Sequence, residues 1–212
     1  MKYDALLMLS GGKDCCSLAF KLTLAEAKNI LCFTLDSSFL SDVAKSNIEK
    51  LTRILDLDSI VIKPKPSKYL RFIEENLSLV QTCTHCSYQT LLSALDICKR
   101  FEINTLYAGF TVFTAKAQGW PVIEKQTYDG INIIHPFMVK DNYNFQAVKA
   151  LMIEHGLEFD PTKTNCKHIR ELISRDVDNC FEKEIEIMHK EGQIDDSERT
   201  YYSDFIKSCR VS

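Results

Sequence analysis

The chain has 212 residues, of which 45% are hydrophobic and 26% are charged. These are the proportions of an ordinary globular protein, and they exclude a disordered chain or a coiled coil. The formal net charge of −3 excludes a generally basic surface for nucleic acid, although it is compatible with a local basic patch. A chain of this length buries about 70% of its surface on folding, which is enough for one complete core with a small appendage.

The beginning of the sequence carries only a short apolar run, over residues 5–9, before polar residues follow. A secretory signal peptide needs a longer apolar region and a cleavage site, and no stretch approaches the roughly 20 apolar residues of a membrane span. We therefore expect a cytoplasmic protein with no membrane partner. Its nine cysteines are then expected to be reduced thiols, metal ligands or redox groups before disulfides.

Apolar runs typical of buried strands alternate with segments in which apolar residues have helical spacing. The expected strands cover residues 5–9, 30–35, 59–62, 105–109 and 131–138. The expected helices cover residues 15–28, 43–55 (capped by Ser41 or Asp42), 69–79, 88–101, 145–155 and 169–190. The stretch over 111–130, which holds Trp120, fits no element and predicts a loop over a site.

This alternation of strands and helices predicts an α/β fold. Repeated strand–helix units build a parallel twisted sheet of about five strands with helices on both faces. The sequence has no internal repeat and no low-complexity linker. We expect one α/β domain over residues 1–157 and a helical C-terminal segment over 158–212 packed on it.

The pentapeptide Ser10-Gly11-Gly12-Lys13-Asp14 directly follows the first expected strand and opens the first helix. The free N–H groups of a helix N-terminus favour an anion there, and two glycines let the backbone approach phosphate oxygens. The Ser10 hydroxyl and the Lys13 ammonium add donors, whereas Asp14 is suited to holding Mg²⁺ or the shape of the loop. The pattern predicts a phosphate-binding loop, with a plain strand–helix turn as the alternative.

These residues resemble the loop of the PP-loop ATP pyrophosphatase superfamily (adenine nucleotide alpha hydrolase-like), whose pattern is Ser-Gly-Gly-x-Asp-Ser. Cys15 stands where the family usually has serine, and a thiol is a weaker donor than a hydroxyl. The loop is not a Walker A pattern. The resemblance implies that residues 10–15 bind ATP with Mg²⁺, that ATP is cleaved between its α and β phosphates to adenylate a carbonyl-type oxygen, and that Lys13 and Asp14 are catalytic.

Polar residues at two further strand ends fit the same nucleotide site. Residues 36–38 follow the second expected strand, near the place of the adenosine, and residues 109–111 follow the fourth. The family often has Gly-His-x-x-Asp-Asp at the latter turn, and this chain lacks that histidine and aspartate pair. Since ligands bind at the carboxyl edge of a parallel sheet, these ends are expected to bind the nucleotide, with an ordinary polar loop as the alternative. The expected residues are Asp36, Ser38, Gly109 and Thr111.

Three of the cysteines have the spacing of metal ligands. Cys83 and Cys86 form a C-x-x-C that we expect immediately before a helix, and Cys166 lies at another expected helix start, where thiolates are favoured. Three thiolates would leave one coordination position open, as in working metal sites. The alternatives are zinc with His85 or His168 as an added ligand, a cubane iron–sulfur cluster, a redox pair and ordinary core cysteines.

The phosphate-binding loop and the three cysteines together resemble the iron–sulfur tRNA thiolases of this superfamily, the two-thiouridine and two-thiocytidine synthetases. The resemblance implies that Cys83, Cys86 and Cys166 hold a 4Fe–4S cluster, with zinc as the alternative metal. A sulfide on the unique iron would attack the adenylated carbon, and AMP would leave. The sulfur donor would be sulfide or a persulfide carrier, and the acceptor a nucleobase, a tRNA or a small molecule.

Other functions use the same loop. A desulfidase would run the sulfur chemistry in reverse, and an amide- or nitrile-forming ligase would carry a structural zinc. A sulfonucleotide reductase needs a Glu-Cys-Gly-Leu-His-like tail that Ser208-Cys209-Arg210 does not resemble. A regulatory domain would bind a nucleotide without turnover. Trp120 and the Tyr201–Tyr202 pair have three possible roles: they could stack on a base, pack in a core or form a dimer contact. A homodimer is therefore a further hypothesis.

Overall fold

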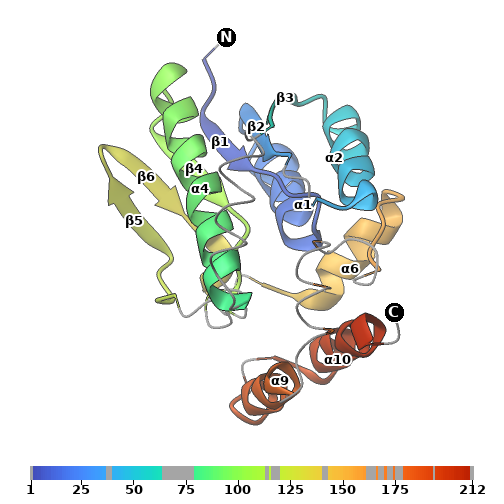
Figure 1. Ribbon diagram of the computed structural model, residues 1–212. Coiled ribbons are helices and arrows are strands. Elements are labelled where there is room, and N and C mark those ends of the chain that lie inside the picture. The colour runs from blue at the N-terminus through green and yellow to red at the C-terminus, as the bar shows by residue number, and fades with distance from the viewer. Residues whose placement is uncertain are drawn as a thin grey trace.

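Six strands of the described chain form one central sheet (Figure 1). The computed structural model describes residues 2–36, 40–63, 79–112, 115, 120–139, 143–160, 166, 170, 174, 179–192 and 194–210, and within them only the backbone of residues 79–85, 180, 181 and 184. The strand order is β3–β2–β1–β4–β6–β5. All neighbouring pairs are parallel except β5–β6, which is antiparallel. The strands are β1 (Ala5–Met8), β2 (Ile30–Leu35), β3 (Asp58–Ile62), β4 (Thr105–Ala108), β5 (Lys125–Tyr128) and β6 (Ile131–Ile134).

Helices cover both faces of this sheet (Figure 1). The helices are α1 (Lys13–Phe20, continued by a π-helical turn over Lys21–Ala25), α2 (Asp42–Ile54), α4 (Leu79–Arg100), α6 (Phe145–Glu154), α9 (Cys180–Lys190) and α10 (Asp196–Arg210). Successive strand residues point to opposite faces, so Leu7 of β1 packs in one core cluster with Leu18 of α1, and Leu6 packs in another with Cys98 of α4. The expected parallel α/β fold is therefore confirmed.

Strand β5 corrects the expectation of a loop over residues 111–130. All of its residues are exposed, so no apolar alternation marks it in the sequence, and it is held by antiparallel pairing with β6. The residues between the two strands, Asp129 and Gly130, have φ angles of 50° and 78°, as a two-residue hairpin turn requires. This Asp-Gly pair is the sequence signal that could have predicted the hairpin.

Helix α4 corrects the expected position of the C-x-x-C motif. The apolar spacing predicts a helix over residues 88–101, but α4 already begins at Leu79, because no proline or glycine interrupts the residues before Tyr88. Cys83 and Cys86 therefore lie within the helix, and the expectation that a helix N-terminus favours their thiolates is wrong. The expected helix over 69–79 lies, apart from its last residue, outside the described residues.

Two other expected elements are shorter in the structure. The strand expected over 131–138 ends at Ile134, because Pro136 opens a 3₁₀ turn and has no backbone N–H for a strand ladder. The helix expected over 169–190 is interrupted at Asn179, whose φ of 54° is left-handed, a conformation that asparagine adopts more readily than most residues. Helix α9 begins only after it.

Helices α9 and α10 form a small layer of their own at the C-terminal end (Figure 1). They pack on each other through a separate apolar cluster, Ile185, Met188, Ile194, Phe205, Ile206 and Cys209. Helix α10 also lies against α6, where the rings of Tyr201 and Phe145 are 5.3 Å apart. The C-terminal segment is thus helical and packed on the α/β part, while the boundary at residue 157 stays a prediction.

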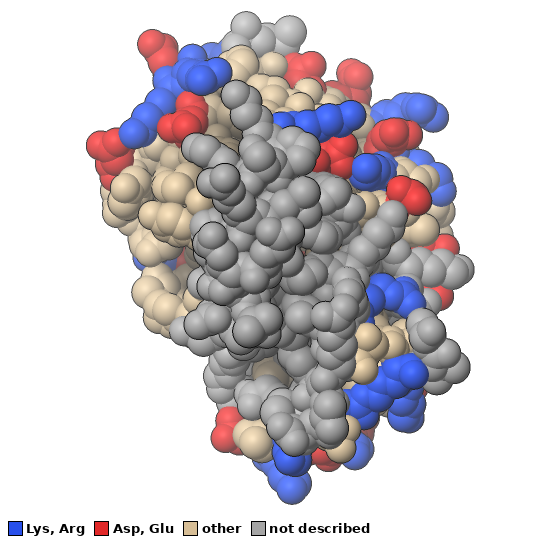
Figure 2. Space-filling model, viewed as in Figure 1, with Lys and Arg blue, Asp and Glu red and all other residues tan. Residues whose placement is uncertain are grey.

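Charges of both signs share the surface. Figure 2 shows acidic and basic side chains side by side along the upper rim of the described surface. Opposite charges also form ion pairs, such as Lys99 with Asp129 of the β5–β6 turn at 2.5 Å and Arg199 of α10 with Glu186 of α9 at 2.7 Å. Among the described helices, none has the length and apolar character needed to cross a membrane.

Candidate functional site

The loop between β1 and α1 is held by close backbone packing on two sides. Gly11 has a φ of +73°, and a Cβ at this position would lie 2.1 Å from the carbonyl oxygen of Ala44 in α2. A Cβ on Gly109, directly after β4, would lie 2.8 Å from the backbone nitrogen of Cys15. Both positions therefore require glycine. We call residues 10–15 the phosphate loop.

The phosphate loop presents backbone donors without acceptors. Gly12 is the N-cap of α1 and supplies no side-chain cap. Within the described part of the chain, the N–H groups of residues 11–15 donate no hydrogen bond. Free donors at the positive end of a helix dipole favour an anion. The predicted phosphate-binding loop thus has the geometry of an anion site.

Asn47 of α2 fixes the phosphate loop through buried hydrogen bonds, and it is not among the residues predicted from the sequence. Its side chain is fully buried, and its amide donates to Gly11 O at 3.0 Å and to Glu158 O at 2.9 Å. Its Oδ1 accepts from the Glu158 N–H at 2.9 Å. The signal was available, because Asn47 is a polar residue on the apolar face of α2 beside Ala44 and Ile48.

Cys15 packs inside the loop. Its Sγ accepts a hydrogen bond from the Ser10 N–H at 3.2 Å, lies 3.2 Å from Ser10 Oγ and donates to Gly12 O at 3.1 Å. The pKa of Cys15 is lowered to about 7, mainly by a hydrogen bond from the neighbouring Cys16 thiol, with a smaller contribution from Ser10 and with burial opposing both. A negative charge on this sulfur at neutral pH would repel an anion bound at the loop.

Lys13, Asp14 and Tyr143 form a closed triangle of hydrogen bonds. The Lys13 ammonium donates to Asp14 Oδ1 at 2.6 Å and to the Tyr143 hydroxyl at 2.7 Å. That hydroxyl donates in turn to Asp14 Oδ1 at 2.9 Å. Lys13 is only 7% exposed, and a charged group this buried needs such partners. The triangle joins the phosphate loop to the residue that precedes the N-cap of α6.

Aromatic rings enclose the Lys13 ammonium. The ring centroids lie between 5.3 and 5.8 Å from its Nζ, within the range of a cation–π interaction. We call these rings the aromatic cage; they belong to Tyr143, Phe145, Tyr201 and Tyr202. Two of them come from α10, so the C-terminal helix contacts the phosphate loop through Lys13.

Glu198 adds a buried carboxyl group near this cage. Burial raises its pKa, while the charge of Lys13 opposes the shift. Its backbone N–H donates to Asp195 Oδ1 at 2.8 Å, and its side chain accepts from the Asp195 N–H at 3.4 Å. These reciprocal bonds form a capping box that fixes the start of α10.

Asp14 has the chemistry to hold a magnesium ion. Its side chain is 21% exposed, and both hydrogen bonds of the triangle go to Oδ1. Its Oδ2 receives no hydrogen bond from the described residues. Carboxylate oxygens are ligands that Mg²⁺ prefers, together with water and substrate phosphates. Asp14 beside the free N–H groups therefore fits an Mg²⁺ that arrives with a phosphate chain.

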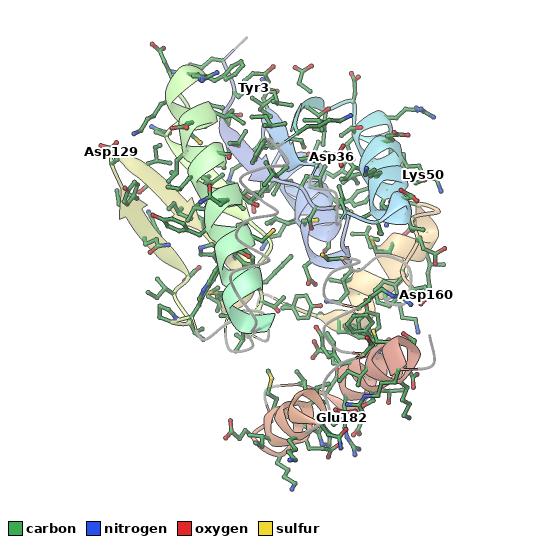
Figure 3. The ribbon with its side chains drawn as sticks, viewed as in Figure 1. Tyr3, Asp36, Lys50, Asp129, Asp160 and Glu182 are labelled. Carbon is green, nitrogen blue, oxygen red and sulfur yellow. The ribbon has the colours of Figure 1, made fainter. Side chains whose placement is uncertain are left out.

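The other expected nucleotide-binding residues are only partly brought to this site. Asp36 follows β2 (Figure 3) and pairs with Lys45 of α2 at 2.9 Å. Gly109 packs on the phosphate loop as described, and Thr111 is buried two residues later, with its carbonyl accepting from Ala115 N at 3.0 Å. Ser38 lies outside the described residues.

His135 marks the neighbouring strand end. It directly follows β6, is 6% exposed, and its Nδ1 has no hydrogen-bond partner among the described residues. Burial lowers the pKa of His135, against a hydrogen bond to the Ala108 backbone that raises it. Its ring lies 5.5 Å from that of Phe110, which packs on Trp120 at 5.2 Å. Burial therefore favours the neutral form of the histidine beside the Phe110 ring.

The structure does not test the predicted metal centre. Cys86 and Cys166 are both half-buried, and the side chain of Cys83 lies outside the described set. The described side chains contain no group of three His, Cys, Asp or Glu residues that could hold a metal ion. Since one predicted ligand is missing from that set, the assignment of Cys83, Cys86 and Cys166 stays a prediction.

Comparison with known proteins supports the fold. No protein-family model matches the sequence, and no curated protein does. The structure of NMN synthetase from Francisella tularensis matches with a TM-score of 0.53 and 14% identity, over 74% of this chain and 63% of the synthetase, which is less than two thirds of it. The PAPS reductase from Candida auris, a phosphate complex, matches with a TM-score of 0.47 and 18% identity over 74% of each chain. The chain thus shares its α/β fold with the NMN synthetase.

Gly11→Ala should destabilise the protein by about 2–4 kcal/mol, because it combines a left-handed backbone with a clash against α2. Gly12→Ala is the matched control: a Cβ there meets only Ser10 Oγ, at 3.6 Å. Its free energy of unfolding should change by less than about 0.5 kcal/mol. Urea unfolding followed by circular dichroism measures both, and equal losses would contradict the packing described for Gly11.

Cys15→Ser should change how nucleotide affinity depends on pH. Between about pH 6 and 8 the wild-type thiol loses its proton, since its pKa is lowered to about 7, and the resulting thiolate repels phosphate. The serine does not ionise, so the variant should bind ATP increasingly better than the wild type as the pH rises. Isothermal titration calorimetry with ATP at several pH values measures the affinity of both proteins. Comparing the two affinities at each pH cancels the contribution from the protonation of ATP itself. Parallel profiles would show that Cys15 carries no charge beside the ligand.

Proposed function

We propose that this protein is a PP-loop enzyme that binds Mg²⁺·ATP at the phosphate loop and cleaves it between the α and β phosphates. The free N–H groups of residues 11–15 carry this proposal. They form a concentrated set of donors at a helix N-terminus, which suits the several oxygens of a polyphosphate better than a single carboxylate. The neighbouring carboxylate of Asp14 suits the magnesium ion that accompanies such a chain.

The proposed reaction begins at the α-phosphorus. An oxygen of the acceptor attacks it, the bond to the β-phosphate oxygen breaks, and magnesium diphosphate leaves. The acceptor carbon then carries AMP as its leaving group, and a sulfur nucleophile displaces it. In this scheme the N–H groups of the phosphate loop stabilise the charge on the phosphate oxygens, Asp14 holds the metal, and Lys13 balances the charge of Asp14.

Sulfur transfer is the finer part of the proposal, with a nucleobase, a tRNA or a small molecule as acceptor and sulfide or a persulfide carrier as donor. It depends on Cys83, Cys86 and Cys166 as ligands of a 4Fe–4S cluster. Cys83 and Cys86 are three residues apart within α4, so they share one face of the helix. A cluster with one free iron would supply a soft, reduced sulfide. His135, beside the ring of Phe110, is a candidate contact for the acceptor.

Formation of AMP tests the nucleotide chemistry. Wild-type protein incubated with Mg²⁺·ATP and either bulk tRNA or fractionated metabolites should release AMP and diphosphate. Asp14→Asn should lower the rate at least about 100-fold, because a neutral amide binds Mg²⁺ poorly. Asp129→Asn, on the exposed β5–β6 turn, is the control and should keep the wild-type rate. ATP that neither binds nor reacts with the wild type would contradict the proposal.

The metal content tests the sulfur chemistry separately. Protein purified without oxygen should be brown and hold about four irons per chain. Cys86→Ser and Cys166→Ser should each lose the iron and still bind ATP, whereas Cys98→Ser, a buried core residue of the same α4, should keep it. Colourless protein with zinc would favour the amide- or nitrile-forming ligase, and metal that survives the loss of Cys166 would refute the proposed ligand set.

A further inference from the structure

We propose that Tyr143 is a positioning residue of the phosphate site, whose hydroxyl orients the Asp14 carboxylate so that one oxygen stays available to the Mg²⁺ of a bound nucleotide. The inference rests on the proposed function, since it concerns the Mg²⁺·nucleotide bound there. Tyr143 lies 129 residues from Asp14 in the chain, and no motif in the sequence marks it. It assigns a role to a residue outside the phosphate loop.

The hydrogen-bond directions support this role. The Tyr143 hydroxyl has one proton, which goes to Asp14 Oδ1 at 2.9 Å, and it accepts from the Lys13 ammonium at 2.7 Å. Asp14 Oδ1 therefore receives two donors, one from each partner, while Oδ2 receives none from the described residues. A carboxylate held by one oxygen in this way has its other oxygen in a defined direction, which is how outer partners orient the ligands of a metal.

The tyrosine is itself fixed. It precedes Asn144, the N-cap of α6, whose Oδ1 accepts from Ala147 N at 3.0 Å. Its ring packs on that of Phe137 with the centroids 5.3 Å apart. Burial raises the pKa of Tyr143 far above its ordinary value, and the charge of Asp14 adds to the shift. The hydroxyl therefore keeps its proton and remains a donor to Asp14 at any pH near neutrality.

The aromatic cage holds the other corner of the triangle. The rings of Tyr201 and Tyr202 from α10 lie 5.7 and 5.8 Å from Lys13 Nζ, and they restrict the movement of the ammonium. Lys13 then has two hydrogen-bond acceptors in fixed places, Asp14 and Tyr143. Removing the Tyr143 hydroxyl would leave Lys13 as the only donor to Asp14 Oδ1 among the described residues, so the carboxylate could rotate.

A magnesium titration of nucleotide binding tests this role. ATP binding is measured by isothermal titration at a series of Mg²⁺ concentrations and also in EDTA, for the wild type and for Tyr143→Phe. The variant should need at least about tenfold more Mg²⁺ to reach half of the full affinity, as is typical when the outer partner of a metal ligand is lost. Its affinity for metal-free ATP should change less than about twofold, since the free N–H groups stay in place.

Tyr107→Phe is the matched control. Tyr107 is a buried tyrosine that, like the half-buried Tyr143, accepts a hydrogen bond from a lysine ammonium, here Lys28, whose Nζ lies 4.7 Å from the ring centroid. Its hydroxyl does not contact Asp14, so the magnesium midpoint of this variant should equal that of the wild type. A merely structural role for Tyr143 would lower the melting temperature of both variants and leave both midpoints unchanged, and that result would overturn the inference.

A double-mutant cycle locates the effect. In an Asp14→Asn background, Tyr143→Phe should cause no further loss of magnesium dependence, because the carboxylate through which it acts is already gone. Additive losses would overturn the inference. Should Tyr143→Phe not fold, Tyr143→Gln and Tyr143→Leu repeat the comparison: the amide can accept from Lys13 and donate to Asp14, and the leucine cannot. Gln should lie closer to the wild type, and equal midpoints for the two would overturn the inference.

The outcomes also separate this inference from the proposed function. If the wild type binds ATP more tightly with Mg²⁺ than in EDTA and Tyr143→Phe has the same magnesium midpoint, the nucleotide site stands and the role of Tyr143 falls. If the wild type binds no ATP under any condition, the proposed function itself falls, and the role of Tyr143 falls with it.

Discussion

The N–H groups of residues 11–15 remain free donors because the loop that carries them is packed against backbone on both sides. Gly11 lies against Ala44 of α2, and Gly109 lies against Cys15 at the start of α1. The buried amide of Asn47 takes the Gly11 carbonyl as its acceptor, which removes that oxygen from competition for the N–H groups. A loop free to relax would turn its donors onto its own carbonyls, so the packing of the loop is what keeps these N–H groups available.

The charges around the loop are largely balanced within the protein. The Lys13 ammonium is used by Asp14, Tyr143 and the aromatic cage, although the sequence predicts it as a donor to phosphate. This difference follows from burial: at 7% exposure an unpaired ammonium would be costly, so the fold supplies partners. Attraction for an anion in the resting protein therefore arises mainly from the backbone N–H groups and the helix dipole.

Periodicity predicted the helices α1, α2 and α6 and all strands but β5, whereas α10 was not predicted as an element and α4 begins earlier than predicted. The position directly after β1 was sufficient to predict the phosphate loop. Periodicity failed for β5, whose residues are all exposed and which is held by its antiparallel pairing with β6. The sequence could not reveal Tyr143 or the tyrosines of α10 as neighbours of Lys13, because those contacts depend on how distant helices pack. Asn47 lies between these cases: its polar side chain on an apolar helix face was visible, but its partners Gly11 and Glu158 were not.

Two helices that are distant in sequence meet at one ammonium group, and this has a thermodynamic consequence. Tyr201 and Tyr202 hold α10 against Lys13, while α9 and α10 otherwise pack through a small cluster of their own. The docking of α10 and the charge state of the phosphate loop are therefore linked through Lys13. Linkage is reciprocal. A ligand that draws the ammonium out of the aromatic cage therefore weakens the docking of α10, and a docked α10 weakens the binding of that ligand by the same free energy.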